Sequence, residues 1–375
     1  MHTQSKFRLL VVRLGAMGDI LHALPAVTAL RQAHPGWVID WVVEPRWRAL
    51  LEADEGPGLG PSSEVTGRAE RSSAKPVVDG LHLAATREWR KHPFAETTLR
   101  GITGLRKKIR AGRYDAVLDL QGAIRSAVVA RMAGCRRVMG EADPRERAAR
   151  WLYSERVETH GAHVIEQDFE LASAVAGDDL KPLMPWLPVD RAAEAWADQV
   201  LPRGGCERTG CEQAVLINPG AGWGAKRWPV ERYAAVARGL IDRGLRVLVN
   251  AGPGEKSLAE AIAQSTGATA VSCSLEQLIA LMRRTKLAIA GDTGPLHLAC
   301  ALGRPVVGIY GPTDPSRNGP FGTRFRVLRS PTSRRDHARH AAPEAGLLTI
   351  LPDDVLRAAD ELLGEDEMLA KESSR

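Results

Sequence analysis

Short apolar runs of strand length recur along the chain, separated by stretches with helical periodicity. Near the N-terminus, Arg8–Arg13 and Trp37–Val43 are strand-like. The apolar residues between Ile20 and Leu30 recur at i, i+3 and i+4, which indicates a helix with one buried face. This pattern predicts a βαβ unit, which we expect to be right-handed with parallel strands.

The same alternation continues through the rest of the chain. Further strand-like runs are Ala116–Leu120, Val215–Ile217, Val247–Val249, Ala268–Val271, Leu287–Ala290 and Val306–Ile309. Helical patterns separate most of these later runs, and helices are also expected at His163–Ala176 and Asp353–Leu363. Such alternation predicts an α/β fold with parallel sheets and helices on both faces. We therefore expect two Rossmann-like, doubly wound domains facing a central cleft.

The chain length also favours two domains, because 375 residues exceed one ordinary domain. Composition predicts an N-terminal domain at 1–185, a connection at 186–212, a C-terminal domain at 213–345 and a C-terminal helix and tail at 346–375. Residues 54–75 are rich in Gly, Pro and Ser and are predicted to be a flexible surface insert.

Composition narrows the class of protein. No apolar stretch approaches the ~20 residues of a membrane span, and Arg13 and Asp19 interrupt the N-terminal apolar run before it forms a signal-peptide core. Five cysteines fit a reducing cytosol, and we interpret Cys206 and Cys211 as part of a polar loop rather than a zinc site. The net charge of +6 favours an anionic partner. Nucleic acid, acidic lipid and phosphorylated sugar remain open on this ground.

The first predicted strand leads into its helix through Gly15-Ala-Met17-Gly18-Asp19, which lacks the third glycine of a dinucleotide fingerprint. Asp19 either caps the helix or acts as a general base, because open α/β sheets bind ligands at the carboxyl ends of their strands. His22 follows one turn later, and its presence favours the catalytic alternative.

Two loops in the second half carry candidate ligand groups. After the strand at Val215–Ile217, Gly220 and Gly222 allow close approach of the backbone to a ligand and Lys226 supplies positive charge. The alternative is a solvated basic loop. After the next strand, Glu255 either accepts hydrogen bonds from a ribose diol or places a favourable charge at a helix start.

The run Leu287–Ala290 ends at an Asp-Thr-Gly turn that restarts as a helix. Such a junction leaves backbone N–H groups unpaired, and phosphate is their usual ligand. Asp292, Thr293, Gly294 and His297 are the candidate residues. The alternative is that Asp292 and Thr293 only cap the helix.

Residues 87–113 contain nine Lys or Arg against two Glu. The stretch is either a solvated face, or a site for an anionic acceptor or an acidic membrane surface. Arg125, which follows Gln121-Gly122, is a further member of the same basic group.

Five motifs occur in one order along the chain: Gly15–His22, Asp119–Gly122, Lys226–Pro229, Asp292–His297 and Tyr310–Pro315. In this order they closely resemble the family 9 glycosyltransferases, over about residues 7 to 330. The Asp119 motif and the run Arg87–Lys91 resemble the members that add the first heptose of lipopolysaccharide more than those that add the second.

The resemblance implies a GT-B architecture and transfer of heptose from ADP-heptose to a Kdo residue of the lipid A inner core. It implies inversion at the anomeric carbon, with no metal ion and no cofactor. It also implies a cytoplasmic protein in peripheral contact with the anionic inner-membrane surface, with no nucleic-acid partner. The alternatives are another family 9 transfer, to the second heptose or from a different nucleotide sugar, and a non-catalytic nucleotide-sugar-binding module.

The resemblance assigns a role to each candidate residue. Asp19 matches the base, Lys226 the residue that faces the diphosphate and heptose, and Glu255 the ribose contact. The other donor-binding residues are Gly220, Gly222, Asp292, Thr293, Gly294 and His297, and the acceptor-binding residues are Met17, Gly18, His22, Arg87, Arg90, Lys91, Gln121 and Arg125. Two features depart from the family: the insert at 54–75, and residues 220–224, which replace a hydroxyl-bearing loop.

Overall fold

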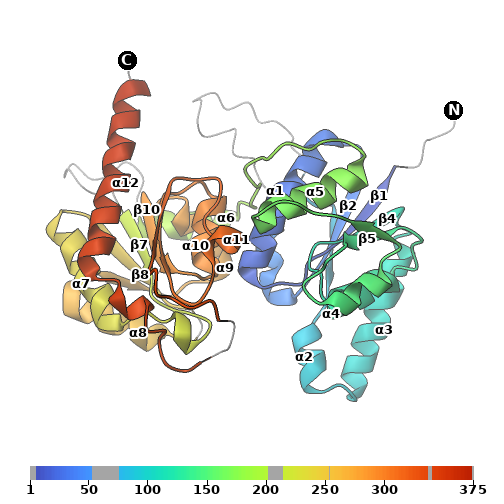
Figure 1. The fold of residues 1–375 in the computed structure, drawn as a ribbon, viewed down its shortest axis with the longest axis horizontal. Helices are drawn as coiled ribbons and strands as arrows, with labels where there is room; N and C mark the ends of the chain where they lie inside the picture. The colour runs from blue at the N-terminus through green and yellow to red at the C-terminus, as the bar shows by residue number, and fades with distance from the viewer. Residues whose placement is uncertain (1–5, 53–75, 202–213, 253, 337–339, 374–375) are drawn as a thin grey trace. The chain divides into compact units, whose positions relative to one another are not determined.

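The computed structural model describes residues 6–52, 76–201, 214–252, 254–336 and 340–373 (Figure 1). The predicted insert at 54–75 and both Cys206 and Cys211 lie outside the described residues. Internal contacts divide the chain into two compact units, Met1–Val189 (unit 1) and Asp190–Arg375 (unit 2). The domain limits drawn from composition stay predictions.

Unit 1 contains a parallel six-stranded sheet in the order β3-β2-β1-β4-β5-β6. Its strands are β1 (Arg8–Val12), β2 (Val38–Val43), β3 (Gly80–Leu83), β4 (Ala116–Asp119), β5 (Val138–Glu141) and β6 (Glu155–Val157). Its helices are α1 (Met17–Ala33), α2 (Thr86–Lys91), α3 (Glu96–Ala111), α4 (Ile124–Met132) and α5 (Val164–Ala176), with 3-10 turns η1 (Pro45–Leu50) and η3 (Arg147–Leu152). This strand order is that of a doubly wound fold.

Unit 2 repeats the topology with the order β12-β11-β10-β7-β8-β9, again parallel throughout. The strands are β7 (Ala214–Asn218), β8 (Arg246–Asn250), β9 (Thr269–Val271), β10 (Leu287–Gly291), β11 (Val306–Tyr310) and β12 (Phe325–Arg329). The helices are α6 (Arg191–Val200), α7 (Val230–Asp242), α8 (Lys256–Thr266), α9 (Leu275–Met282), α10 (Gly294–Ala301), α11 (Pro315–Asn318) and α12 (Pro352–Ser373), with 3-10 turns η4 (Gly224–Lys226) and η5 (Leu347–Thr349).

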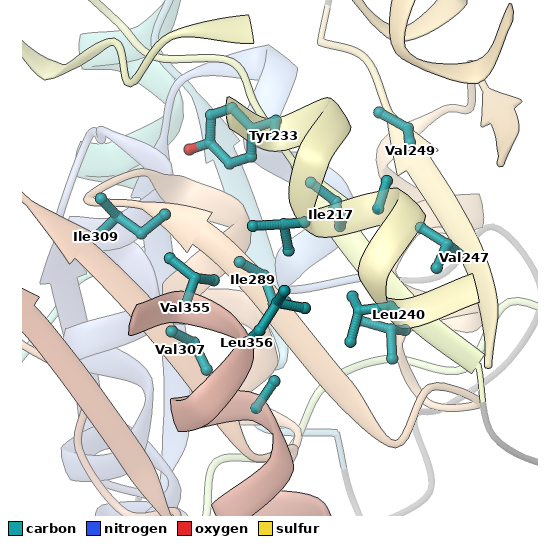
Figure 2. Close-up of a cluster of buried hydrophobic side chains, with 14 of the residues drawn as sticks. Ile217, Tyr233, Leu240, Val247, Val249, Ile289, Val307, Ile309, Val355 and Leu356 are labelled. Carbon is teal, nitrogen blue, oxygen red and sulfur yellow. The ribbon is translucent and has the colours of Figure 1, made fainter. Parts of the chain in front are cut away.

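The core of unit 2 shows why the central strands are so apolar. Figure 2 shows Ile217 and Ile289, from the adjacent strands β7 and β10, beneath Leu240 of α7 and Leu356 of α12. Both helices pack on one face of the sheet, and the whole cluster is buried. A parallel strand that is covered on both faces has a continuous run of apolar residues in its sequence, because neither face is exposed to water.

The structure confirms the predicted α/β class and places a strand or helix at every predicted run. Four strands were not predicted, namely β3, β5, β6 and β12. β3, β6 and β12 lie at sheet edges, and β5 lies next to the edge strand β6. β3, β5 and β6 have only three or four residues, and each of the three edge strands carries charged or exposed residues. The apolar signal is weak at the sheet margins because one side of each outer strand is less covered.

Candidate functional site

In unit 1 the chain order of the strands reverses between β1 and β4, and an open α/β sheet binds its ligand at such a point. The loops that follow these two strands are joined by one hydrogen bond, in which Leu14 N donates to Gln121 Oε1 at 2.8 Å. Gln121 is buried, so its side-chain oxygen holds the β1 loop in place. Its predicted contact with an acceptor stays a prediction.

Asp19 lies in the first turn of α1, which begins at Met17. Its Oδ2 accepts a hydrogen bond from Ala16 N at 2.9 Å, so the capping role is confirmed. The guanidinium of Arg13 lies against Asp19, with Nε donating to the backbone oxygen at 3.0 Å and Nη2 3.9 Å from Oδ1. The Asp19 side chain is still 35% exposed, which a group that takes a proton from a ligand requires.

Two further carboxyl groups lie in the field of the Arg13 charge. Asp119 ends β4 and accepts hydrogen bonds from Ser126 and Tyr153, both at 2.8 Å. Burial raises the pKa of Asp119 to about 6, although these bonds and Arg13 act in the opposite direction. Burial likewise raises the pKa of Asp168 on α5 to about 7, with Arg13 opposing the rise and Asp19 adding to it. The charge of one buried guanidinium therefore acts on three acidic side chains.

Other predicted acceptor residues of α1 point inward. Met17 and His22 are buried, and Gly18 is half-buried. The His22 ring lies edge-on to that of His163, with centroids 5.6 Å apart. His163 in turn caps the start of α5, where its Nδ1 accepts a hydrogen bond from Ile165 N at 3.2 Å. The structure therefore places His22 in the contact between α1 and α5.

The basic residues assigned to an acceptor are all exposed. Arg87, Arg90 and Lys91 lie on α2, and Arg125 lies in the first turn of α4. Lys91 pairs with Glu88 at 2.7 Å. Burial and the nearby charge of Arg87 lower the pKa of Arg46, the residue after Pro45 in η1. Two guanidinium groups held near each other favour an anion between them.

In unit 2 the strand order reverses between β7 and β10, and three predicted donor residues converge there. Lys226, in η4 after β7, donates from Nζ to Asp292 Oδ2. His297, in the first turns of α10, places Nε2 3.3 Å from Asp292 Oδ1. The Nζ of Lys226 also lies 4.5 Å from the centre of the Trp223 ring, which is a cation–π distance.

The Asp292 carboxyl is largely buried, with 11% of the side chain exposed, and this burial alone would raise its pKa. The hydrogen bond with His297 and the charge of Lys226 outweigh that effect and hold the pKa of Asp292 well below its usual range. Asp292 is therefore a fixed anion that orients Lys226 and His297.

The capping-only alternative for this turn is wrong. Thr293 precedes α10 but its side chain does not cap the helix; Oγ1 donates instead to the Gly291 carbonyl at 3.2 Å. Gly294 opens the helix and is followed by proline, which has no N–H. The first turn of α10 thus lies beside the cluster of Lys226 and His297, and a helix N-terminus favours anionic groups.

Glu255 and Gly220, predicted from separate loops, are in direct contact. A Cβ added to Gly220 would lie 1.9 Å from Glu255 Oε2, and one added to Gly252 would lie 2.9 Å from the same atom. Only glycine at position 220 leaves room for this carboxylate. Gly222 differs, because a Cβ there would meet nothing within 4 Å.

Residues 102–346, well over half of the chain, match the family model of glycosyltransferase family 9 (heptosyltransferase). The chain belongs to glycosyltransferase family 9. It is accordingly a glycosyltransferase, as the motifs predicted.

Individual family 9 relatives extend this likeness over most of the chain. Lipopolysaccharide heptosyltransferase 1 of Escherichia coli K12 is 31% identical over 86% of this chain and 94% of its own length. Lipopolysaccharide heptosyltransferase 2 of the same organism is 32% identical, but over only 40% of this chain and 46% of its own. The structure of the E. coli heptosyltransferase WaaC with ADP-2-deoxy-2-fluoro heptose superposes with a TM-score of 0.71 and 28% identity, covering 95% of this chain and 99% of that one. Together with the two doubly wound units, this likeness confirms the GT-B architecture.

Sequence reasoning missed two charged residues near Asp19 in unit 1, Arg13 and Asp168. Arg13 was considered only as an interruption of an apolar run, although an arginine directly after a buried strand is itself unusual. Asp168 follows Ile165 by three residues and precedes Ala172 by four, so it lies on the buried face of α5. A single carboxylate on an apolar helix face is a signal that could have identified it.

Two properties of the described residues concern membrane insertion and metal binding. None of the described helices is long and apolar enough to cross a membrane. The same residues contain no group of three or more His, Cys, Asp or Glu side chains arranged to hold a metal ion. The predicted independence from metal ions stays a prediction.

Proposed function

We propose that this family 9 enzyme transfers heptose from ADP-heptose to a Kdo residue of the lipid A inner core, with inversion and without a metal ion. The observation that carries the proposal is the cluster of Lys226, Asp292 and His297 at the switch point of unit 2. It supplies positive charge at a helix start, where the diphosphate of the donor would bind. The likeness to lipopolysaccharide heptosyltransferase 1 over 86% of the chain supports the same substrates.

The chemistry is a single displacement. The acceptor hydroxyl oxygen attacks the anomeric carbon of heptose, and its proton passes to the Asp19 carboxylate. The bond from that carbon to the β-phosphate oxygen breaks, and the electron pair leaves with ADP. The Lys226 ammonium and the His297 imidazole stabilise the negative charge that develops on the leaving group, as preorganised hydrogen-bond donors do in other transfers. Attack from the side opposite the leaving group inverts the anomeric carbon.

Asp292 has an indirect part in this scheme. Its carboxylate is already engaged by Lys226 and His297, and the low pKa keeps it charged. It holds the Lys226 ammonium and the His297 imidazole in one orientation, so that little reorganisation is needed when ADP departs.

Glu255 completes donor binding through the ribose. Its carboxylate lies against Gly220 at the carboxyl edge of the sheet, where acidic residues of doubly wound folds accept hydrogen bonds from ribose hydroxyls. Residues 220–224 bear no hydroxyl side chain, so in this scheme the phosphates there rest on backbone amides and on Lys226.

The acceptor would bind on unit 1. Kdo carries a carboxylate and lipid A carries phosphates, and the exposed guanidinium groups of Arg87, Arg90 and Arg125 match such groups in charge and geometry. We place the enzyme at the cytoplasmic face of the inner membrane, because its lipid acceptor is anchored there.

A donor and acceptor screen on the purified protein tests the proposal. ADP-heptose with a Kdo-containing lipid A precursor should yield one added heptose of inverted configuration, detected by mass spectrometry and NMR. UDP- and GDP-sugars should give no product, and EDTA should leave the rate unchanged. Tight ADP binding without product from any Kdo acceptor would instead identify a non-catalytic module, and activity lost in EDTA and restored by magnesium would overturn metal independence.

A second candidate is transfer of the second heptose. The 32% identity to lipopolysaccharide heptosyltransferase 2 over 161 residues supports it, although that match covers less than half of either chain. The same donor with an acceptor that already bears one heptose separates the two. Faster turnover on that acceptor than on the unmodified Kdo acceptor would favour the second candidate.

A further inference from the structure

The net positive charge of the chain is concentrated on one helical hairpin. Residues 86–111, which form α2, α3 and the turn between them, are called the α2–α3 hairpin below. They contain eight Lys or Arg and two Glu, a net of +6 that equals the net charge of the whole chain. All the other residues together are therefore electrically balanced, and the hairpin is the dominant positive feature.

The tip of the hairpin carries an exposed aromatic side chain. Figure 1 shows α2 and α3 projecting from the sheet of unit 1, with their connecting turn at the far end. Phe94 lies in that turn and is 93% exposed, more than any other large apolar side chain among the described residues. Pro93 beside it is also exposed. An apolar group held so far out of the protein is stabilised only by an apolar partner.

Contacts within the hairpin keep Phe94 outside. Thr98 Oγ1 donates to the His92 carbonyl at 2.7 Å, which closes the turn. Trp89 packs so tightly on α3 that a Cβ at Gly101 would lie 2.8 Å from its Nε1. Trp89 therefore occupies the space between the helices, and the tip cannot fold back to cover the phenyl ring.

The outer face of α3 is basic along its length. Thr98, Leu105 and Ile109 form the buried face. Arg100 and Lys107 each follow a buried residue, Thr98 or Leu105, by two positions. Two positions correspond to about half a turn of a helix, so both side chains lie on the opposite face. Leu99, next to this stripe, is 55% exposed. Arg100 pairs with Glu96, but an exposed pair of this kind is weak and leaves the cation available.

We infer that the α2–α3 hairpin docks the enzyme on an anionic lipid bilayer, with Phe94 inserted among the lipids and the basic face of α3 against the phosphate headgroups. This inference rests on the proposed function, because the proposed acceptor is itself embedded in such a bilayer. Exposed Phe side chains of membrane-binding segments bury at the boundary between headgroups and acyl chains, and clustered Lys and Arg are attracted to anionic headgroups.

A membrane fits these features better than a nucleic acid does. Proteins that bind single strands use a basic groove lined by aromatic rings on which bases stack. Here the aromatic ring lies on a projecting tip, and the exposed Leu99 beside the basic face would gain nothing from stacking. A projecting tip with apolar and basic side chains suits a lipid bilayer, because the apolar side chains can insert between the lipids while the basic ones stay at the headgroups.

Sedimentation with lipid vesicles tests the inference on the full chain. Vesicles of phosphatidylcholine with about one third phosphatidylglycerol should bind the protein, pure phosphatidylcholine should not, and added salt should weaken the binding. Phe94→Ala should lower the partition coefficient by roughly fivefold to tenfold, and the double variant R100E/K107E by about tenfold or more.

Matched controls separate the hairpin from general surface chemistry. Phe325→Ala removes a partly exposed phenylalanine of unit 2, and K181E/K286E makes the same charge change as R100E/K107E at two exposed lysines elsewhere. Both should bind vesicles like the unmodified protein. Equal loss in the controls, no loss in the hairpin variants, or no binding by the unmodified protein would overturn the inference. Hairpin-dependent binding of a single-stranded oligonucleotide without vesicle binding would identify a nucleic-acid surface instead.

A water-soluble acceptor separates this inference from the proposed function. With a deacylated Kdo acceptor, Phe94→Ala should transfer heptose at the normal rate, whereas with acceptor in vesicles its rate should fall along with its binding. If the unmodified protein binds vesicles through the hairpin but transfers no heptose to either acceptor, the proposed function fails and the docking surface stands. If transfer occurs and the hairpin variants bind vesicles normally, only the docking surface fails.

Discussion

The two switch points have the same topology and opposite charge arrangements. In unit 1, the cation Arg13 lies against Asp19, and its charge also acts on the buried carboxyl groups of Asp119 and Asp168. In unit 2, the single anion Asp292 lies between Lys226 and His297. Apart from Asp168 on α5 and His297 on α10, these residues lie at the ends of the same pair of strands or in the loops and first helical turn that follow them, and these strands are the first and fourth of a doubly wound sheet.

This difference suits the two halves of a glycosyl transfer. A group that removes a proton must be a carboxylate with some access to the ligand, and Asp19 is the only one of the three acids in unit 1 that is not fully buried. A group that receives a departing diphosphate must be positive. The shared fold supplies the location, and the residues at each switch point supply the chemistry.

The strongest way to break the comparison is to remove the proposed base. Asp19→Asn retains the size of the side chain and its hydrogen bond from Ala16 N, but it cannot accept the proton. The rate of heptose transfer should fall by about 10²- to 10⁴-fold. ADP affinity, measured by calorimetry, should stay within about twofold of the original, because ADP is assigned to unit 2. Unchanged turnover would remove Asp19 from the mechanism.

The second test removes the cation of unit 2. Lys226→Ala leaves the Asp292 anion without its ammonium partner, so both leaving-group stabilisation and ADP binding should suffer. We expect kcat/KM to fall by roughly 10²- to 10³-fold and the Kd for ADP to rise. Lys286→Ala, at an exposed lysine of the same unit, is the control and should behave normally. A Lys226 variant with normal ADP affinity and normal rate would contradict the donor assignment.

The third test concerns the stability of the acidic switch point. Asp168 has a pKa of about 7 in the folded chain, above that of an unfolded aspartate, so the folded state holds more protons than the unfolded state between about pH 4 and pH 7. Ionisation of this group therefore lowers the free energy of unfolding as pH rises through that window. Asp168→Asn removes the effect.

Urea unfolding of the full chain at pH 5 and pH 8 measures this. The stability of the Asp168→Asn variant relative to the unmodified protein should increase by about 2 to 3 kcal/mol between the two pH values. Asp143→Asn removes an exposed carboxyl that faces Arg147, and it is the control. Its difference should not change with pH in this range. A constant difference for Asp168→Asn would mean that Asp168 is not the titrating group.

The smallest expected effect comes from two glycines of one loop. Gly220→Ala places a methyl group where Glu255 now lies, so the carboxylate must move. The KM for ADP-heptose should rise by about tenfold, because that is the effect expected from losing one good hydrogen bond to the donor. Gly222→Ala meets open space and should change little. Equal effects at the two positions would show that the Glu255 contact does not matter for the donor.

Most of the fold followed from the sequence because the central strands are buried on both faces. The charge clusters followed only in part. Lys226 and Asp292 were each predicted at a strand end, but they are 66 residues apart, and their pairing depends on β7 and β10 being neighbours. Strand order is set by packing of whole units, which no local pattern encodes. For the same reason the sequence did not connect Gln121 to the loop of Leu14.

Asp19 illustrates a different limit. The sequence left capping and catalysis as alternatives, yet the capping bond from Ala16 N uses one carboxylate oxygen and leaves the side chain partly exposed. From the sequence alone, capping and catalysis are competing explanations for Asp19, whereas the positions of its two carboxylate oxygens allow both.

The turn that carries Lys226 depends on a segment far along the chain. Ala225 N donates to the His340 carbonyl at 3.0 Å and Glu344 N donates to Ala225 O at 3.2 Å. A Cβ at Gly224 would lie 1.7 Å from the Ala341 oxygen. During synthesis, therefore, Arg13, Asp119 and Asp168 have all emerged with Asp19 once residue 168 has left the ribosome, whereas the Lys226 turn lacks this support until residues 340–344 emerge. A growing chain would acquire the acidic switch point long before the basic one.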